Sequence, residues 1–420
     1  MSAITEIDAR TVLDSRGNPT VEVDLFLESG SAGRAAVPSG ASTGEAEAVE
    51  LRDGGEAWGG LGVERALANI RGEIREAVTG LEALDQEALD RRLVDLDGTP
   101  NKKRLGANAI LAVSMAASRA AADECQLPLY RYLGGPSACR LPIPLLNVIN
   151  GGAHASNNLD IQEFMVAPVG AADFPTAIRQ GCEVYQHLKK RLQKLRLSTT
   201  VGDEGGFAPD LSSDEEALEL IVDAIQDAGF SVGVEEDFAL ALDVAASELH
   251  QEGRYSLRGE SMESAGLVEH YRKLSERFPL VSIEDGMDEN DWAGWQLLTE
   301  NLGGELVLVG DDLLVTHPAR LQRAVRERAA NGILIKLNQI GTVTETLTTI
   351  RLAQQAGFRV VISHRSGETE DHYIADLATA TGAGWIKAGA PCRSDRNAKY
   401  NRMLRIHEEL GSSAGYGPLC

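Results

Sequence analysis

From residue 139 onward, short apolar segments alternate with segments of helical length, and this pattern limits the fold more than any other feature. A short, nearly continuous apolar run is typical of a strand covered on both faces in a parallel sheet. Repeated βα units of this kind predict a (β/α) barrel. No helical segment separates the first two runs, so we expect an irregular start. The runs are 143–149, 161–166, 238–242, 280–283, 306–309, 333–337, 359–362 and 384–386.

The first part of the chain has a different pattern and is expected to form its own domain. It begins with strands, including an alternating segment at 20–27 and a further segment at 34–37 that continues an antiparallel sheet. Helical periodicity then follows at 63–78, 86–93 and 107–123. The Gly-Gly-Pro-Ser break at 134–137 ends this pattern. We therefore expect an α+β domain at 1–138 and the barrel domain at 139–420.

The charge balance argues against two classes of partner. Lys and Arg number 40 against 63 Asp and Glu, which gives a net charge of −23. Nucleic acids and anionic membranes both attract positive charge, so we expect no direct binding to either. The five cysteines have no metal-ligand spacing, and the amino terminus does not read as a signal peptide. These features predict a cytoplasmic protein.

Polar residues stand where several barrel strands should end. The carboxyl ends of barrel strands meet on one face, where active sites are built. Asp243, Glu284 and Asp311 are three carboxylates at such ends. Each alone could be a helix cap or a turn residue. Three from neighbouring strands, with oxygen ligands only, favour a Mg²⁺ site.

Lys336 interrupts one of the apolar runs. Burial and a nearby cation both disfavour the charged form of a lysine, so a metal ion and Lys387 beside it would lower its pKa. Such a lysine can act as a general base. The alternatives are a lysine that reaches solvent from an edge strand and one held in a buried salt bridge.

An anion pocket and a proton donor complete the predicted chemistry. His364, Arg365 and Ser366, together with Lys387, resemble a phosphate or carboxylate pocket, although a salt-bridged barrel mouth would use the same residues. Metal, base and anion pocket together indicate removal of a proton next to a carboxylate. The acid that protonates a leaving hydroxyl could be a glutamate of raised pKa, either Glu163 in an apolar run or Glu204 in a glycine-rich turn.

Several longer motifs resemble the enolase family, the phosphopyruvate hydratases of glycolysis. The similarity runs nearly from end to end, and a set of motifs in the family's order is more specific than any one of them. The motifs lie at 14–21, 39–44, 105–110, 202–209, 282–285, 336–342 and 363–369.

The resemblance implies an enolase-type (β/α)8 barrel with an irregular ββαα start, preceded by a smaller α+β domain. It also implies reversible dehydration of 2-phosphoglycerate to phosphoenolpyruvate. Lys336 would take the proton from C2. Glu204, supported by Glu163, would protonate the departing C3 hydroxyl.

The resemblance implies the ligand contacts as well. Asp243, Glu284 and Asp311 would hold a first Mg²⁺, and a second Mg²⁺ would arrive with the substrate through its phosphate and Ser42. The remaining contacts are Arg365 and Ser366 to the phosphate, Lys387 to the substrate carboxylate, and His154 and His364 lining the pocket. The implied assembly is a homodimer or an octamer.

A few residues depart from the family pattern, including Ala388, where the family usually has threonine, and the histidines His372 and His407. The chain also ends early, at 417–420, but none of these departures removes a catalytic group. They leave two alternatives: an enolase-like paralogue acting on a phosphonate analogue, and a binding protein displayed on the cell surface or held in an RNA-processing complex.

Overall fold

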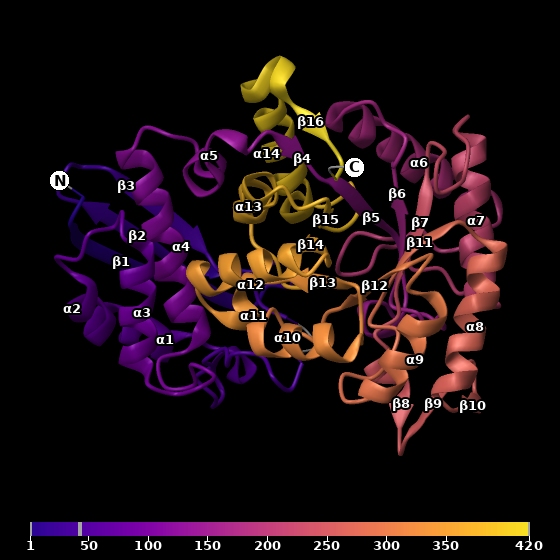
Figure 1. Cartoon of the computed structure of the whole chain (residues 1–420), viewed down its shortest axis with the longest axis horizontal. Helices are drawn as coiled ribbons and strands as arrows, with labels where there is room; N and C mark the ends of the chain where they lie inside the picture. The colour runs from indigo at the N-terminus through magenta and orange to yellow at the C-terminus, as the bar shows by residue number, and fades with distance from the viewer. Residues whose placement is uncertain (1, 41–43, 419–420) are drawn as a thin grey trace.

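The computed structural model describes residues 2–40 and 44–418, which form an N-terminal sheet with helices and a closed barrel (Figure 1). The fold class predicted from the sequence is confirmed, because an α+β region precedes an eight-stranded barrel with helices around it. The boundary at residue 138 stays a prediction.

The N-terminal sheet is antiparallel, with the order β1 (Ile4–Leu13), β2 (Pro19–Leu27) and β3 (Ala32–Ala36). The alanine-rich helix α4 (Ala107–Glu124) packs on it so closely that a Cβ on Gly33 would lie 2.1 Å from the Ala116 carbonyl oxygen. Small side chains on both elements therefore allow this contact.

Two other N-terminal helices differ in length from the predictions, since one is divided into shorter pieces and one is extended. The predicted helix at 63–78 is divided into α1 (Glu64–Asn69), a π-helical turn (Ile70–Ile74) and α2 (Arg75–Val78), because Gly72 leaves the helical region at φ −101° and ψ −109°. Helix α3 (Gln86–Asp97) continues one turn beyond the predicted end, until Gly98 caps it in the left-handed region.

The barrel contains every apolar run predicted as a strand. Its order is β11-β12-β13-β14-β15-β5-β6-β7, and pairing is parallel except at β5–β6 and β6–β7. Helices α6 (Phe174–Lys194) and α7 (Asp214–Asp227) both follow β6, which gives the irregular ββαα start. The strands are β5 (Ile143–Asn150), β6 (Glu163–Ala167), β7 (Ala239–Asp243), β11 (Leu280–Glu284), β12 (Val307–Gly310), β13 (Gly332–Ile335), β14 (Arg359–Ser363) and β15 (Trp385–Lys387).

The barrel is packed inside and covered outside. Met165, Ala241, Val309, Leu334 and Val361 from five different strands fill its interior. The outer helices are α8 (Ser264–Arg277), α9 (Trp292–Leu302), α10 (Pro318–Glu327), α11 (Leu337–Ile340), α12 (Val343–Gln355), α13 (Tyr373–Thr381) and α14 (Ser394–Leu410).

Several small elements were not predicted. A three-stranded sheet of β8 (His250–Gln251), β9 (Arg254–Leu257) and β10 (Glu260–Met262) stands outside the barrel (Figure 1). Helix α5 (Leu129–Gly134) and the two-stranded pair of β4 (Arg140–Leu141) with β16 (Gly415–Tyr416) were also missed. These segments are too short to show a clear periodicity.

One predicted strand ends earlier than expected. The run at 333–337 leaves the sheet after Ile335, because Leu337 begins the short helix α11. The Lys336 amide donates to Thr316 Oγ1 over 2.9 Å instead of to a neighbouring strand. Lys336 therefore stands just past the strand end, on the face where the other predicted site residues lie.

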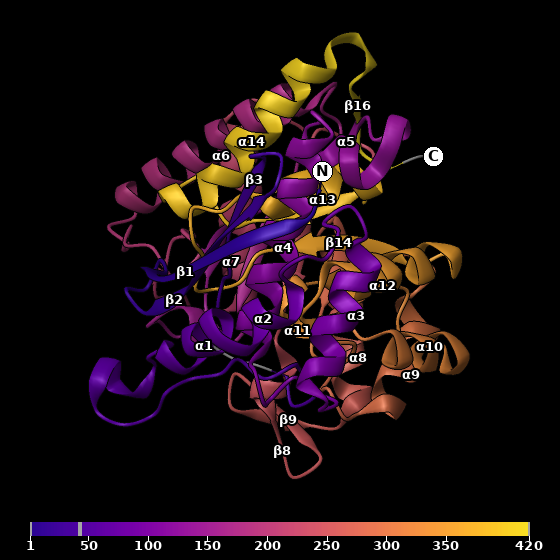
Figure 2. The same cartoon turned by 90° about the vertical axis from the view of Figure 1, so that its left-hand side faces the viewer.

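The N-terminal region docks on the barrel, with α4 and the sheet in front of α13 and β14 (Figure 2). Arg119 of α4 donates two hydrogen bonds to Asp371, at 2.6 and 2.8 Å, and Asp371 also accepts from the Ala36 amide of β3 at 3.0 Å. A single carboxylate of the barrel domain thus holds two N-terminal elements.

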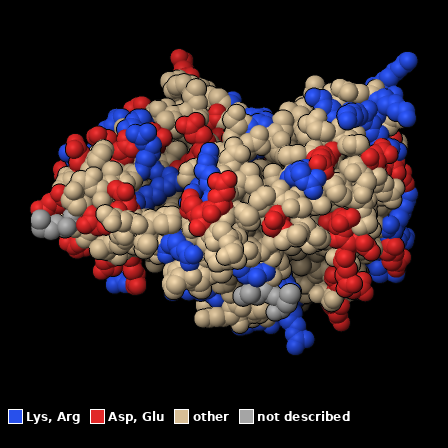
Figure 3. Space-filling model, turned by 90° about the horizontal axis from the view of Figure 1, so that it is seen from above, with Lys and Arg blue, Asp and Glu red and all other residues tan. Residues whose placement is uncertain are grey.

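The surface mixes both signs of charge. Lys and Arg alternate with Asp and Glu on the face seen in Figure 3. None of the helices within residues 2–40 and 44–418 combines the length and the apolar character needed to cross a membrane.

Candidate active site

The polar residues predicted at strand ends lie together on one face of the barrel. Asp243, Glu284 and Lys387 are the last residues of β7, β11 and β15. Asp311, Lys336 and His364 directly follow β12, β13 and β14. All of these except Glu284 line a pocket that Glu163, Glu204 and His154 also line. The sequence rule for strand ends therefore placed these side chains correctly.

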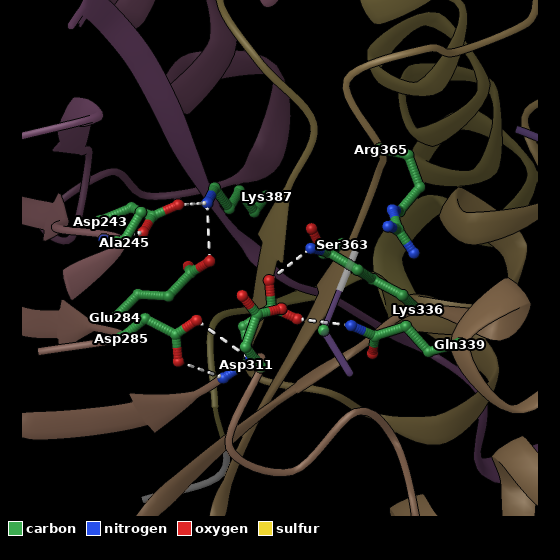
Figure 4. A network of polar contacts seen from close by, with 12 residues as sticks. Asp243, Ala245, Glu284, Asp285, Asp311, Lys336, Gln339, Ser363, Arg365 and Lys387 are labelled. Atoms are coloured by element: carbon green, nitrogen blue, oxygen red, sulfur yellow. Dashed lines mark hydrogen bonds and ion pairs between the residues drawn. The ribbon is translucent and has the colours of Figure 1, made fainter. Parts of the chain in front are cut away.

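Lysines bridge the carboxylates (Figure 4). Lys387 Nζ lies 2.6 Å from Asp243 Oδ2, 2.8 Å from Glu284 Oε1 and 3.0 Å from Glu163 Oε1. Lys336 Nζ donates to Asp311 Oδ2, and Gln339 Nε2 donates to Asp311 Oδ1 over 2.8 Å. Each of the three predicted metal ligands thus contacts a lysine, Asp243 and Glu284 through Lys387 and Asp311 through Lys336.

The pKa of Lys336 is raised in the chain alone. Burial lowers the pKa of this lysine, but the adjacent Asp311 carboxylate outweighs that effect and raises it above the ordinary value. In the chain alone Lys336 is therefore a cation in a buried salt bridge. The predicted lowering of the pKa assumed a bound metal ion and stays a prediction. Without the ion, the Asp311 carboxylate that the barrel places beside the amine decides the direction.

The residues present fit a divalent cation. Carboxylates outnumber lysines here, since Asp285 and Asp312 stand next to the predicted ligands Glu284 and Asp311. Asp285, Asp311 and Asp312 each offer an oxygen, all within 4.8 Å of one another. Burial and the Asp311 carboxylate raise the pKa of Asp312 to about 8. A bound cation would favour the ionised carboxylates that this crowding opposes, and such a cluster of oxygen donors suits a hard metal ion.

Asp285 and Asp312 were missed in the sequence. Both directly follow a predicted ligand, so the acidic pairs at 284–285 and 311–312 were the available signal. Asp285 also has a structural role, because its carboxylate accepts from the Asp311 amide at 2.8 Å and the Asp312 amide at 3.0 Å. It therefore fixes the turn that presents Asp311.

A second group of titratable side chains lines the same pocket and contacts Lys387 through Glu163. His154 Nδ1 lies 3.7 Å from Glu163 Oε1 and 3.5 Å from Glu204 Oε2, and His364 Nε2 lies 3.4 Å from Glu204 Oε1. Asn147 donates to Glu204 Oε2 over 2.9 Å. The structure thus brings together the four predicted residues of this group, which are His154, Glu163, Glu204 and His364.

The two glutamates differ in pKa. Burial, together with repulsion from Glu204, raises the pKa of Glu163 well above its usual range. Burial also opposes ionisation of Glu204, but the imidazoles of His154 and His364 outweigh it and its pKa lies well below the usual range. In the chain alone Glu163 therefore binds a proton more readily than Glu204 does. The sequence left both glutamates as candidates for a raised pKa, and only Glu163 has one.

The predicted anion pocket is buried, and its arginine already forms hydrogen bonds to other side chains of the protein. Arg365 Nη1 and Nη2 lie 2.9 and 3.2 Å from the two oxygens of Glu47, and Nη1 also donates to Asn338 Oδ1 over 3.1 Å. Figure 4 shows Arg365 on the far side of the network from Asp243. Ser366 lies beside it with 6% of its surface exposed. Ser42 falls outside the described residues, so its predicted contact stays a prediction.

Comparisons with known proteins agree over the whole chain. The family model described as "Enolase, N-terminal domain" matches residues 4–133, and the model described as "Enolase, C-terminal TIM barrel domain" matches residues 138–418. A curated protein named "Enolase" from Acidothermus cellulolyticus is 57% identical over 416 residues, which cover 99% of this chain and 96% of that relative.

Proposed function

The chain belongs to the enolase family and is a phosphopyruvate hydratase, and we propose that the pocket at the strand ends is where it removes water from 2-phosphoglycerate. The observation that carries this proposal is that a single pocket is lined by Lys336 with its partner Asp311 and by the Glu163–Glu204 pair with its histidines. Dehydration needs a base and an acid that act on adjacent carbons. We assign these roles to Lys336 and to the glutamate pair.

Substrate binding is assigned to the buried cations. We infer that Arg365 and Ser366 bind the phosphate, since a guanidinium fork suits a phosphate oxygen pair. Lys387 would bind the carboxylate, and it already lies within 3.0 Å of three carboxylates of the protein. His154 and His364 would line the part of the pocket that holds the C3 hydroxyl.

The family acts with a metal cofactor, and we propose Mg²⁺ with Asp243, Glu284 and Asp311 as the residues that hold it. A second Mg²⁺ would enter with the substrate through Ser42. When bound, Mg²⁺ supplies positive charge where the enolate charge develops. If Asp311 served as a metal ligand, it would stabilise the ammonium of Lys336 less. The pKa of Lys336 would then fall, which suits the amine to act as the base.

The chain's own residues then divide the two proton transfers. We propose that Lys336 takes the proton from C2 and that Glu204 protonates the departing C3 hydroxyl. Because Glu163 binds a proton more readily than Glu204 in the chain alone, Glu204 would receive the proton from its neighbour before donating it. This relay would give both glutamates a role in the reaction.

The setting of the reaction is inferred in the same way. We propose a glycolytic enzyme of the cytoplasm that acts on a small phosphorylated carboxylic acid and assembles as a homodimer or octamer. The division at residues 1–138 and 139–420 is proposed as the division between a capping and a catalytic domain.

An absorbance assay tests the function directly. Purified protein receives 2-phosphoglycerate with Mg²⁺, and the enol product is followed near the ultraviolet edge. We expect a rise that EDTA abolishes and excess Mg²⁺ restores. No rise from folded, Mg²⁺-loaded protein would contradict the proposal.

A further inference from the structure

We propose that Arg396 is a positioning residue, which holds His364 as the tautomer with its proton on Nε2 and so presents that N–H to the pocket beside Glu204. The inference rests on the proposed function for the role of Glu204, and it adds a residue that the strand-end pattern does not contain. Arg396 lies on α14 and has no exposed surface.

The contact with the ring decides the tautomer. Arg396 Nη1 lies 2.5 Å from His364 Nδ1. A guanidinium has donors only and stays protonated in proteins, so Nδ1 must be the acceptor. A neutral imidazole that accepts at Nδ1 carries its proton on Nε2. The arginine therefore sets which ring nitrogen can donate into the pocket.

The other side of the ring faces the reacting groups. His364 Nε2 lies 3.4 Å from Glu204 Oε1 and has no hydrogen-bond partner among the described residues, although the ring is only 2% exposed. A buried donor without a partner costs free energy, which a bound ligand can recover. The Nε2–H is thus available to the departing hydroxyl and to the carboxylate that protonates it.

Burial, with the surrounding cations, favours the neutral ring. Burial lowers the pKa of His364 well below its ordinary value despite the Glu204 carboxylate, and the cations that face it add to this effect. Those cations are Arg396 and Lys399 from α14 and Lys387 from β15.

The same guanidinium supports both halves of the site. Nη1 also donates to the Arg365 carbonyl at 2.6 Å, and Nη2 donates to the carbonyls of Ser366 at 2.6 Å and Asp203 at 3.0 Å. It therefore ties the backbone of the proposed phosphate contacts to the residue before Glu204. The Asp395 carboxylate, 2.8 Å from Nε, balances its charge.

Space for this arginine depends on a glycine. Gly389 has φ +85°, and a Cβ there would lie 2.8 Å from Arg396 Cδ and 2.7 Å from the Glu204 carbonyl oxygen. The guanidinium reaches the ring because this position carries no side chain.

The test is the ¹⁵N NMR spectrum of protein labelled at histidine, with the His364 signals assigned from a His364→Gln variant. In the unmodified chain we expect Nδ1 without a proton and Nε2 with one. Arg396→Met removes the donors at similar length, and the proton should then distribute to Nδ1. The matched control is Arg402→Met, since Arg402 lies on the same helix and pairs with Asp376; it should leave the His364 signals unchanged.

Kinetics give a second reading. Arg396→Met should lower dehydration more than C2 proton exchange, by about tenfold to a hundredfold, the range seen when a residue that orients a catalytic group is lost. Arg396→Lys keeps a charged donor and should retain the Nε2 tautomer, so it serves as the conservative control. If the Met variant fails to fold, the tautomer of the unmodified chain still decides the proposal.

Two results would overturn the proposal: a protonated Nδ1 in the unmodified chain, or an unchanged tautomer in Arg396→Met. The spectra need no substrate. A protein that fails to dehydrate 2-phosphoglycerate but shows the expected tautomers would therefore contradict the proposed function and leave the positioning intact.

Discussion

Replacing Asp371 by Asn should loosen the joint between the N-terminal region and the barrel. Asp371 accepts hydrogen bonds from both Nη atoms of Arg119 and from the amides of Ala36 and Tyr373. Its side chain is 9% exposed and that of Arg119 is 18% exposed. Removing one partner of a buried ion pair costs about 3–5 kcal/mol, because the other charge is left buried and unpaired. The residual exposure of Arg119 places our expectation at the lower end, about 3 kcal/mol.

Urea unfolding followed by tryptophan fluorescence measures this change as a shift in midpoint at constant slope. The matched control is Glu87→Gln, which breaks a pair with Arg91 whose side chains are 69% and 65% exposed. It should cost no more than about 0.5 kcal/mol. The double variant Arg119→Met with Asp371→Asn should lose about 2 kcal/mol less stability than the sum of the losses in the two single variants.

The stability that Asp371 contributes to the fold should change with pH in a definite direction. Burial opposes ionisation of Asp371, but Arg119 outweighs it and lowers the pKa below the ordinary value. A lowered folded-state pKa stabilises the fold above the unfolded-state pKa of about 3.9, and that contribution is lost as the pH falls through the folded-state value. The deficit of Asp371→Asn should thus persist from neutral pH to about pH 4 and shrink below it. A midpoint equal to that of Glu87→Gln, or fully additive losses, would refute this reasoning.

Two further predictions concern the pocket. Asp311→Ala should weaken Mg²⁺ binding in calorimetry by at least about tenfold, since even residues that only support a metal ligand contribute that much, and unchanged affinity would remove Asp311 from the ligand set. Gly389→Ala should destabilise the fold by about 1–3 kcal/mol more than Gly357→Ala in thermal unfolding, because both glycines have positive φ but only Gly389 has neighbours within 4 Å of the place that the added methyl group would take. Equal losses at the two glycines would show that backbone strain alone sets the cost.

Much of the site was predictable because its signals are local. Asp243, Glu284 and Lys387 each end an apolar run, and the carboxyl ends of barrel strands must meet on one face. The irregular start could be predicted too, because no helical segment stands between the runs at 143–149 and 161–166.

The rest depends on contacts between distant segments. Arg396 reaches His364 from a helix that begins after the last barrel strand, and Glu47 reaches Arg365 from the N-terminal region. The residues around Arg396 and around Glu47 do not indicate which distant side chain each one contacts. The pKa shift of Lys336 in the chain alone could not be predicted for the same reason, since it depends on how closely barrel closure brings the Asp311 carboxylate to the amine.

The central claim is that Lys336 and Glu204 perform separate proton transfers, and exchange of the C2 proton with solvent deuterium tests it most directly. NMR of 2-phosphoglycerate in D₂O with Mg²⁺ follows exchange, and absorbance follows dehydration in the same samples. We predict that Lys336→Ala loses both, while Glu204→Gln keeps detectable exchange and loses most of its dehydration. Exchange that survives in Lys336→Ala, or that disappears together with dehydration in Glu204→Gln, would contradict the account.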